Sequence, residues 1–283
     1  MYTLGLKVES TDSQIYFHGR WDASPGTWCC FVTQLTYTGP AQDLRSVALN
    51  LGPHTTSPLA SIAVSVDYNN FTTVNVSSGT NDIPLEPSSR SSVVRINVEG
   101  WQNNWINLES LVLNSDANLL PYQPSELSFL FIGNSLSAGQ YLPQGINQAW
   151  LFLIREHFKA EHTVIAQPGA ALSDIASYGN VHGISFQFFK TEDTGYYYTT
   201  DHNYTTPWNF SRDKPTPTHI YLVFKWISRS LHNFQVYLKF VHHLRRIYDK
   251  QPIFVFTPWD WSAAGGEVSY YHDGKYEEIV SRR

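Results

Sequence analysis

The chain has 283 residues, of which 42% are hydrophobic and only 15% are charged. This composition excludes an intrinsically disordered chain, and the length is enough for about two domains of about 100–200 residues each. The formal net charge of −5 at pH 7 gives no basic surface, so nucleic acid is not an expected partner.

Residues 1–120 show the period of β-strands. Hydrophobic or β-branched residues alternate in three runs, at Ile62, Val64 and Val66, at Thr72, Val74 and Val76, and at Val94, Ile96 and Val98. This period of two predicts half-buried antiparallel strands, and turn-forming residues separate the runs. No helical pattern interrupts them. We therefore expect an antiparallel β-sandwich of jelly-roll type over residues 1–120.

The pattern changes after a short proline-containing linker at 121–126. Four apolar runs follow, "LSFLFIG", "HTVIAQ", "THIYLVF" and "PIFVFTPW". Continuous apolar runs of this length predict strands that are covered on both faces. Helical periods lie between some of them, at Trp150, Leu153, Ile154, His157 and Phe158 and at Phe234, Tyr237, Leu238, Val241, Leu244 and Tyr248. Residues 127–283 are therefore predicted to form an α/β domain with a parallel sheet.

Ser135 follows the first of these strands, in "FIGNSLSAG". Ligands of such sheets bind beyond the carboxyl ends of the strands, where a serine can serve as a nucleophile. A nucleophilic serine needs a base, a group that orients the base, and donors for the oxyanion. The pattern is not the G-x-S-x-G elbow, because position 137 is Ser.

The stretch "FIGNSLSAG" resembles the first block of the SGNH, or GDSL, hydrolases. The chain as a whole resembles fungal members related to carbohydrate esterase family 2, which join an N-terminal jelly roll to an SGNH domain. "HGRWDASPGTW" is similar to the start of that jelly roll and "VEGWQNNWINLESLVLN" to its end. The resemblance implies a three-layer, flavodoxin-like α/β domain over 127–283.

The resemblance implies roles for two residues. Ser135 matches the nucleophile, and its backbone N–H matches one oxyanion donor. Gly169, in "AQPGAALSDI", matches the glycine whose N–H is the second donor; an ordinary turn glycine is the alternative. The implied substrate is an acylated carbohydrate such as acetylated xylan. No metal and no organic cofactor are expected.

Two further blocks of the family differ here. Ile227 stands where an oxyanion Asn is expected, and losing such a donor lowers the rate about a hundred- to a thousandfold. No histidine follows an Asp by three residues, so the D-x-x-H block, the last strand and the last helix are expected beyond Arg283. Residues 29–42 and 221–233 also depart from the family, which suggests a truncated, degenerate chain or a misread gene.

Other residues offer alternatives. His182 follows the second block, and Asp201–His202 and His272–Asp273 are adjacent pairs that are expected to be solvated loops. Trp259 and Trp261 follow the last strand and either stack on a sugar or pack in the core. The adjacent residues Cys29 and Cys30 predict neither a disulfide with each other nor a metal site.

The evidence on location points in two directions. Four N-x-[ST] sequons suggest an extracellular lineage, at Asn70, Asn75, Asn203 and Asn209. The N-terminus lacks the layout of a signal peptide. No apolar run reaches the roughly 18 residues of a membrane helix, so no membrane partner is expected.

Three functions therefore compete at this point. The first is a carbohydrate esterase that uses Ser135. The second is a catalytically dead relative that still binds glycan. The third is a non-functional product of a damaged gene, whose incomplete sheet exposes an apolar edge.

Overall fold

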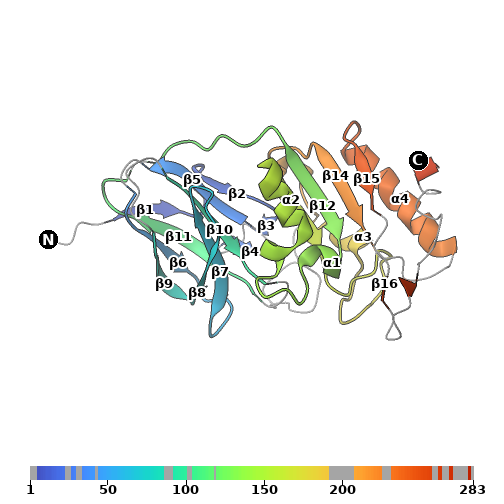
Figure 1. The fold of residues 1–283 in the computed structure, drawn as a ribbon, viewed down its shortest axis with the longest axis horizontal. Coiled ribbons are helices and arrows are strands. Elements are labelled where there is room, and N and C mark those ends of the chain that lie inside the picture. Colours follow the sequence, from blue (N-terminus) through green and yellow to red (C-terminus); the bar gives the residue numbers. More distant parts are fainter. Residues whose placement is uncertain are drawn as a thin grey trace.

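The structure is a computed structural model that describes residues 5–22, 27–29, 34–41, 44–85, 92–100, 104–117, 119–190, 207–224, 231–256, 261–262, 268–269 and 280–281. Antiparallel sheets occupy the N-terminal half, and a parallel sheet with helices occupies the C-terminal half (Figure 1). The residues between them, including the predicted linker, run along one side of the molecule. The predicted change from antiparallel strands to a parallel sheet with helices is confirmed.

The described strands of the N-terminal half form two antiparallel sheets. The first has the order β3 (Trp21–Asp22), β4 (Thr27–Cys29), β11 (Asn107–Leu113), β6 (Val47–Leu51) and β9 (Gly79–Ile83), with β1 (Leu6–Glu9) also paired to β11. The second has the order β2 (Ile15–Phe17), β5 (Gln34–Ala41), β10 (Ser92–Val98), β7 (Ala60–Val66) and β8 (Thr72–Val76). All three strands predicted from alternation are present.

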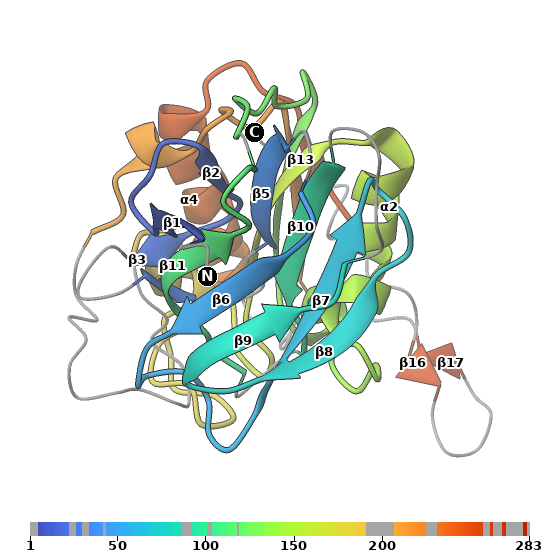
Figure 2. The same ribbon diagram turned by 90° about the vertical axis from the view of Figure 1, so that its left-hand side faces the viewer.

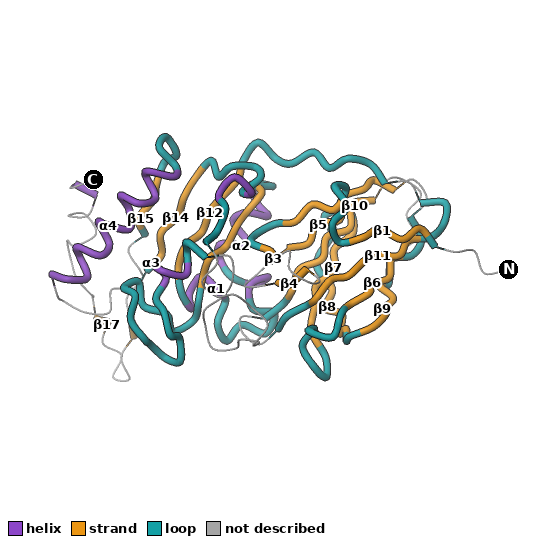
Figure 3. Tube along the Cα trace, turned by 180° about the vertical axis from the view of Figure 1, so that it is seen from behind, coloured by secondary structure: helices purple, strands orange, loops and turns teal. Residues whose placement is uncertain are grey.

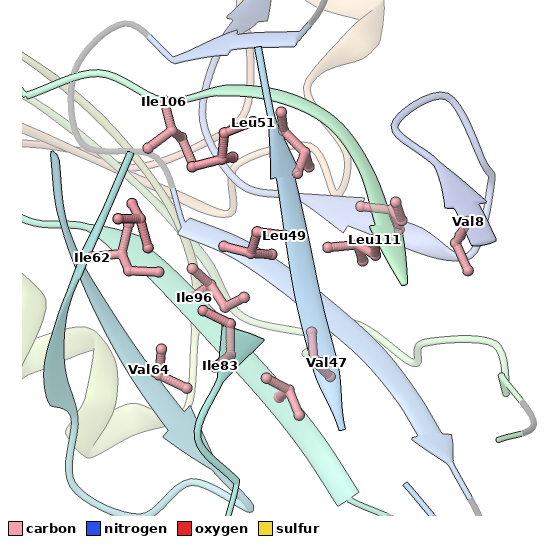
Figure 4. Close-up of a cluster of buried hydrophobic side chains, with 14 of the residues drawn as sticks. Val8, Val47, Leu49, Leu51, Ile62, Val64, Ile83, Ile96, Ile106 and Leu111 are labelled. Carbon is pink, nitrogen blue, oxygen red and sulfur yellow. The ribbon is translucent and has the colours of Figure 1, made fainter. Parts of the chain in front are cut away.

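One apolar core lies between these two sheets. Leu49 and Leu111 come from the first sheet, and Ile62 and Ile96 come from the second (Figure 4). Because successive side chains of a strand point to opposite faces, the alternating apolar residues line this shared interior. We call this pair of sheets the N-terminal sandwich.

The other face of the second sheet is also buried at β7 and β10, contrary to the prediction of half-buried strands, whereas Thr73 and Asn75 on β8 are exposed. Ser65, Arg95 and Asn97 are at most 2% exposed, although their place in the alternation predicts a face in water. Figure 2 shows this layer from the sandwich end, with β5, β10, β7 and β8 following one another. The reason is that the C-terminal half packs on this face: Arg95 Nη1 lies 2.6 Å from Oε1 of Glu156, on helix α2 (Trp150–Phe158).

The C-terminal half is built on a parallel sheet. Its strand order is β13 (Glu161–Ala166), β12 (Ser128–Gly133), β14 (His219–Val223) and β15 (Ile253–Val255), which confirms all four predicted strands. Gly133, the last residue of β12, is the register partner of Ala166 and of Val223. The carboxyl ends of the three strands therefore meet at one edge. A separate hairpin pairs β16 (Trp261–Ser262) with β17 (Val268–Ser269).

Helices cover both faces of the parallel sheet. Phe129 and Phe131 of β12 pack with α2, and Leu130 and Ile132 pack in the cluster of α3 (Ile184–Gln187) and α4 (Leu231–Ile247). Figure 3 shows α2 and α4 on opposite sides of the sheet. The remaining helical segments described are α1 (Ser135–Ala138), η1 (Ile146–Gln148) and η2 (Phe210–Arg212).

The predicted face is correct for one long helix and wrong for the other. In α4 the expected residues are buried or partly buried, among them Phe234 and Leu244. In α2, Leu153 and Phe158 are exposed, whereas Leu151, Phe152 and Arg155 are buried. Helix α2 lies between the sheet and the sandwich, so its buried surface includes a charged residue that periodicity assigns to solvent.

Candidate active site

Ser135 lies at the carboxyl edge of the parallel sheet. Strand β12 ends at Gly133, and Ser135 begins α1, a single helical turn. The carbonyl of Asn134 accepts hydrogen bonds from the backbone N–H of Ser137 (2.9 Å) and of Ala138 (3.0 Å). Asn134 and Ser137 are buried, whereas Ser135 is partly exposed. The turn therefore leaves the predicted nucleophile accessible between buried neighbours.

Gly169 lies on the loop that follows the neighbouring strand, three residues beyond Ala166. Its φ of +77° is the left-handed conformation that favours glycine. A Cβ here would also lie 2.7 Å from Cβ of Tyr178 and 3.3 Å from Nδ2 of Asn180. Both the backbone conformation and the surroundings therefore require a glycine.

The side chain of Asn180 holds this turn closed. Its Nδ2 donates to the carbonyl oxygens of Pro168 and Ser177, each at 3.0 Å. Asn180 is not among the predicted site residues, because nothing in the spacing shows that a residue eleven positions after Gly169 returns to it. The loop is thus a closed unit, which fixes the direction of the Gly169 backbone.

The backbone N–H groups of Ser135 and Gly169, the two predicted oxyanion donors, are both unengaged in the described loops that carry them. Among the described residues, no turn or loop hydrogen bond uses either N–H as a donor. Each follows the end of one of two paired strands. Backbone donors that are held by the fold and not already engaged can stabilise the charge that develops in acyl transfer.

The same loop carries an Asp–His pair. Nδ1 of His182 lies 2.8 Å from Oδ1 of Asp174, and the same oxygen accepts the backbone N–H of Gly183 at 3.2 Å. The His182 ring stacks on Phe186 at 3.7 Å, and both members of the pair are partly exposed. A carboxylate that orients an imidazole is the arrangement of a general base in serine hydrolases. The D-x-x-H motif does not include this pair, because Asp174 lies eight residues before His182.

This edge of the sheet also contains unused hydrogen-bond acceptors. In the part of the chain that the structure describes, Oδ1 of Asn134, Oε1 of Gln167 and Oδ1 of Asn180 are buried without a partner. Buried polar atoms almost always have a partner, so three such atoms on adjacent loops indicate a place with spare capacity to bind donors.

Several predicted residues lie outside the described residues. They are Ile227, Trp259, Asn203, Asp201, His202, His272, Asp273 and Cys30, together with the side chains of Cys29 and Trp261. Of the sequons, Asn70, Asn75 and Asn209 are exposed, and Asn209 caps η2 by accepting from the Ser211 N–H. Glycosylation at these positions stays a prediction.

The described residues contain neither a candidate metal site nor a candidate membrane-spanning helix. No group of three His, Cys, Asp or Glu side chains in that part of the chain is arranged to hold a metal ion. Among the helices described, none combines the length and the apolar character needed to span a membrane.

The arrangement of the antiparallel sandwich beside the parallel sheet is the fold of the family two carbohydrate esterases. The structure of such an esterase from Cellvibrio japonicus has a TM-score of 0.73 and 13% identity, covering 98% of this chain and 84% of that chain. A family two carbohydrate esterase from Clostridium thermocellum in complex with cellohexaose has a TM-score of 0.65 and 17% identity, with coverages of 95% and 84%.

A third structure of the same fold is the acetyl xylan esterase Est2A from the rumen bacterium Butyrivibrio proteoclasticus. Its TM-score is 0.63 at 12% identity, over 89% of this chain and 80% of that chain. No family model matches the sequence. No curated protein matches it either. At these identities the likeness establishes the fold, and function has to be argued from the site.

Proposed function

We propose that this chain is a serine-dependent carboxylic ester hydrolase that removes acetyl or similar acyl groups from carbohydrate. One observation carries the proposal: Ser135 and Gly169 follow the ends of two strands whose last residues, Gly133 and Ala166, are register partners. A nucleophile and a second backbone donor are thereby held on adjacent loops. The fold shared with carbohydrate esterases supports the substrate class.

The chemistry would be acyl transfer in two steps. Oγ of Ser135 attacks the ester carbonyl carbon while its proton passes to a base. The N–H groups of Ser135 and Gly169 stabilise the oxyanion of the tetrahedral intermediate. The C–O bond to the sugar breaks, and the sugar hydroxyl leaves with a proton returned by the base. Water then attacks the acyl-enzyme in the same way and releases the carboxylic acid.

His182 is our candidate for the base within the described residues. Its Nδ1 faces Asp174, which leaves Nε2 as the ring nitrogen for the serine proton. The loop that carries this pair also carries Gly169. If His182 is the base, the His182→Ala variant will lose activity as severely as a variant without Ser135. A His182→Ala variant with full activity would assign the base to another residue.

The test of the function compares two serines on the same helical turn. Hydrolysis of p-nitrophenyl acetate and of acetylated xylan is measured for the unmodified chain and for Ser135→Ala and Ser137→Ala. Removal of the nucleophile is expected to lower kcat at least about a thousandfold. Ser137 is buried and its Oγ has no partner among the described residues, so Ser137→Ala is the matched control and should stay active. Equal rates for the unmodified chain and Ser135→Ala would refute serine catalysis.

The second candidate function is glycan binding without catalysis. It is favoured by the Clostridium thermocellum neighbour, which is a complex with cellohexaose. Calorimetric titration with cello-oligosaccharides distinguishes the two functions. Binding by both the unmodified chain and Ser135→Ala, without turnover of any acetyl ester, would support the binding function.

Three finer structural proposals accompany the function. The N-terminal sandwich is of jelly-roll type and occupies residues 1–120, a linker occupies 121–126, and a domain of SGNH type begins at 127.

The exposed sequons Asn70, Asn75 and Asn209 support an extracellular location. A mass shift removed by a glycosidase, after secretion from a eukaryotic host, would test that location.

A further inference from the structure

The helical turn that begins with Ser135 is too short to hold its own shape. α1 has four residues, and forming the first turn of a helix is unfavourable in isolation. It ends at Gly139, whose φ is 71° and whose N–H donates to the carbonyl of Ser135. Besides its attachment to β12, the position of Ser135 therefore depends on what holds the segment that follows, residues 139–147.

That segment is held by close backbone contact with the N-terminal sandwich. Gly145 forms a parallel bridge with Gly100, and the N–H of Ile146 donates to the Gly100 carbonyl at 3.3 Å. A Cβ at Gly145 would collide with the Gly100 backbone. On its other side, the Gly145 carbonyl closely faces Gly139. Gly145 therefore lies between Gly139, at the end of the serine-bearing turn, and Gly100, which follows β10.

A buried polar network fixes the same segment. Asn97 Nδ2 donates to Oδ1 of Asn147 at 2.8 Å, and Asn147 Nδ2 donates to Oε1 of Glu99 at 3.2 Å. Thr73 donates to the same Glu99 oxygen at 3.0 Å and accepts from Gln144 at 3.4 Å. Asn97 and Glu99 lie at the end of β10, and Asn147 lies in η1. Both polar atoms of the Asn147 side chain and the NH2 group of Asn97 are paired, whereas Oδ1 of Asn97 has no partner among the described residues. A different arrangement of this segment would leave further buried polar groups unpaired, so these hydrogen bonds favour the arrangement observed.

We propose that Asn97, Glu99 and Gly100, at the end of β10, are positioning residues that set the place of Ser135 through residues 139–147. They act on the nucleophile from outside the parallel sheet and do not touch substrate. The kinetic part of this inference rests on the proposed esterase function. Its structural part, that the network holds α1, stands independently of catalysis.

The test removes Asn147 and compares it with a matched asparagine. Asn147→Ala deletes the hydrogen bonds to Asn97 and Glu99. Asn50→Ala also deletes two side-chain hydrogen bonds, to Ser110 and Thr80, but on the first sheet of the sandwich. At a temperature well below both melting transitions, we expect kcat to fall about 10- to 100-fold in Asn147→Ala with little change in KM, because small misplacements of reacting groups have effects of this size. Asn50→Ala should keep the kcat of the unmodified chain.

A second readout does not need activity. The N–H groups of Ser137, Ala138 and Gly139 bond within the serine-bearing turn, so their hydrogen exchange reports its opening. We expect faster exchange of these amides in Asn147→Ala and unchanged exchange in Asn50→Ala. Equal exchange in the two variants, or equal kcat in a chain that shows Ser135-dependent hydrolysis, would overturn the inference. Hydrolysis that is independent of Ser135 would overturn the proposed function and leave the exchange comparison to decide the positioning role.

Discussion

Nδ1 of His18 lies 3.0 Å from Oε2 of Glu161, and both side chains are 4% exposed. His18 follows β2 of the N-terminal sandwich, and Glu161 is the first residue of β13. The Glu161 carboxylate also accepts from the Tyr122 hydroxyl at 2.5 Å and from the Ser125 N–H at 2.9 Å. One buried carboxylate therefore joins the sandwich, the connecting segment and the parallel sheet.

We expect the protein to lose stability in mild acid through two buried histidines. Burial lowers the pKa of His18, although the bond to Glu161 opposes this, and burial with the nearby Arg155 lowers the pKa of His162 well below its usual value. As the pH falls, these two histidines therefore bind protons at a higher pH in the unfolded chain than in the folded protein. This stability is complete above about pH 6.5, the unfolded pKa, and is lost as the pH falls towards the folded values.

Urea denaturation between pH 7.5 and 5 measures this effect. Each histidine contributes a slope of up to about 1.4 kcal/mol per pH unit. Glu161, whose pKa is lowered by His18 and Tyr122 despite its burial, acts in the same direction at lower pH. His162→Gln should reduce the slope, and an unchanged slope in that variant would contradict the prediction.

Glu99 should show the opposite dependence on pH. Burial raises its pKa, and the hydrogen bonds from Thr73 and Asn147 only partly offset this. The side chain of Glu99 is thus most favourable in its protonated, uncharged form. The stability that it contributes is lost as the pH rises above the pKa of the unfolded chain. Glu99→Gln keeps the acceptor oxygen and removes the charge. We expect this variant to unfold at a higher temperature than the unmodified chain at pH 7 and to lose that advantage near pH 4. A variant less stable at pH 7 would show that the ionised group is needed.

Gly169→Ala should lower both stability and activity. The φ of +77° strains an alanine, and the new Cβ would crowd Tyr178. We expect a loss of about 1–3 kcal/mol in the free energy of unfolding, together with a lower kcat/KM. Gly79→Ala is the control: its φ is +104°, but a Cβ there has open space and is far along the chain from the site. It should share the backbone penalty and keep full activity, so parallel losses of activity in both variants would argue against a role for Gly169.

Arg20 should be among the most important residues for stability. It is buried, and its Nη1 donates to the carbonyl oxygens of Phe188 and Lys190 beyond α3. Its guanidinium also lies over the Phe188 and Trp208 rings, at 4.7 and 5.0 Å from their centroids. Arg20→Ala removes the donor to the carbonyl of the buried Phe188 and leaves a space between the rings, so we expect a loss of about 3 kcal/mol.

The exposed Arg45, which pairs with Asp116 at the surface, provides the control for this prediction. Surface pairs contribute little, so Arg45→Ala should leave the unfolding midpoint nearly unchanged. Thermal or urea unfolding of both variants makes the comparison. Similar shifts for Arg20→Ala and Arg45→Ala would show that burial of the guanidinium is unimportant.

Much of the fold could be predicted from local pattern alone. Val94, Ile96 and Val98 alternate and are buried, and the continuous apolar run at 128–133 is the strand covered on both faces. Prediction from the sequence pattern failed where the second sheet of the sandwich packs against the C-terminal half. Arg95 and Asn97 have the period of a face in water, and their burial depends on partners about 50 or more residues away in the sequence, which periodicity does not encode.

The candidate site could be predicted only in part, for a related reason. Ser135 and Gly169 each follow a recognisable strand, so their place at the sheet edge follows from chain order. Asp174 and His182 meet because a loop folds back on itself, and the spacing of eight residues corresponds to no regular element. Asn147 meets Asn97 across two layers of the molecule. Such pairs become visible only with the three-dimensional arrangement.

The close approach of Gly100 and Gly145 bears on how this protein can change over evolution or in the laboratory. A side chain at Gly145 would collide with the Gly100 backbone, so the two halves of the chain have matching surfaces along this contact. A chimera that takes its first hundred residues from a relative will need the matching 139–147 segment from the same parent. Recombination breakpoints should therefore be tolerated poorly between these two glycines, even though the connecting segment there looks like the natural place to cut.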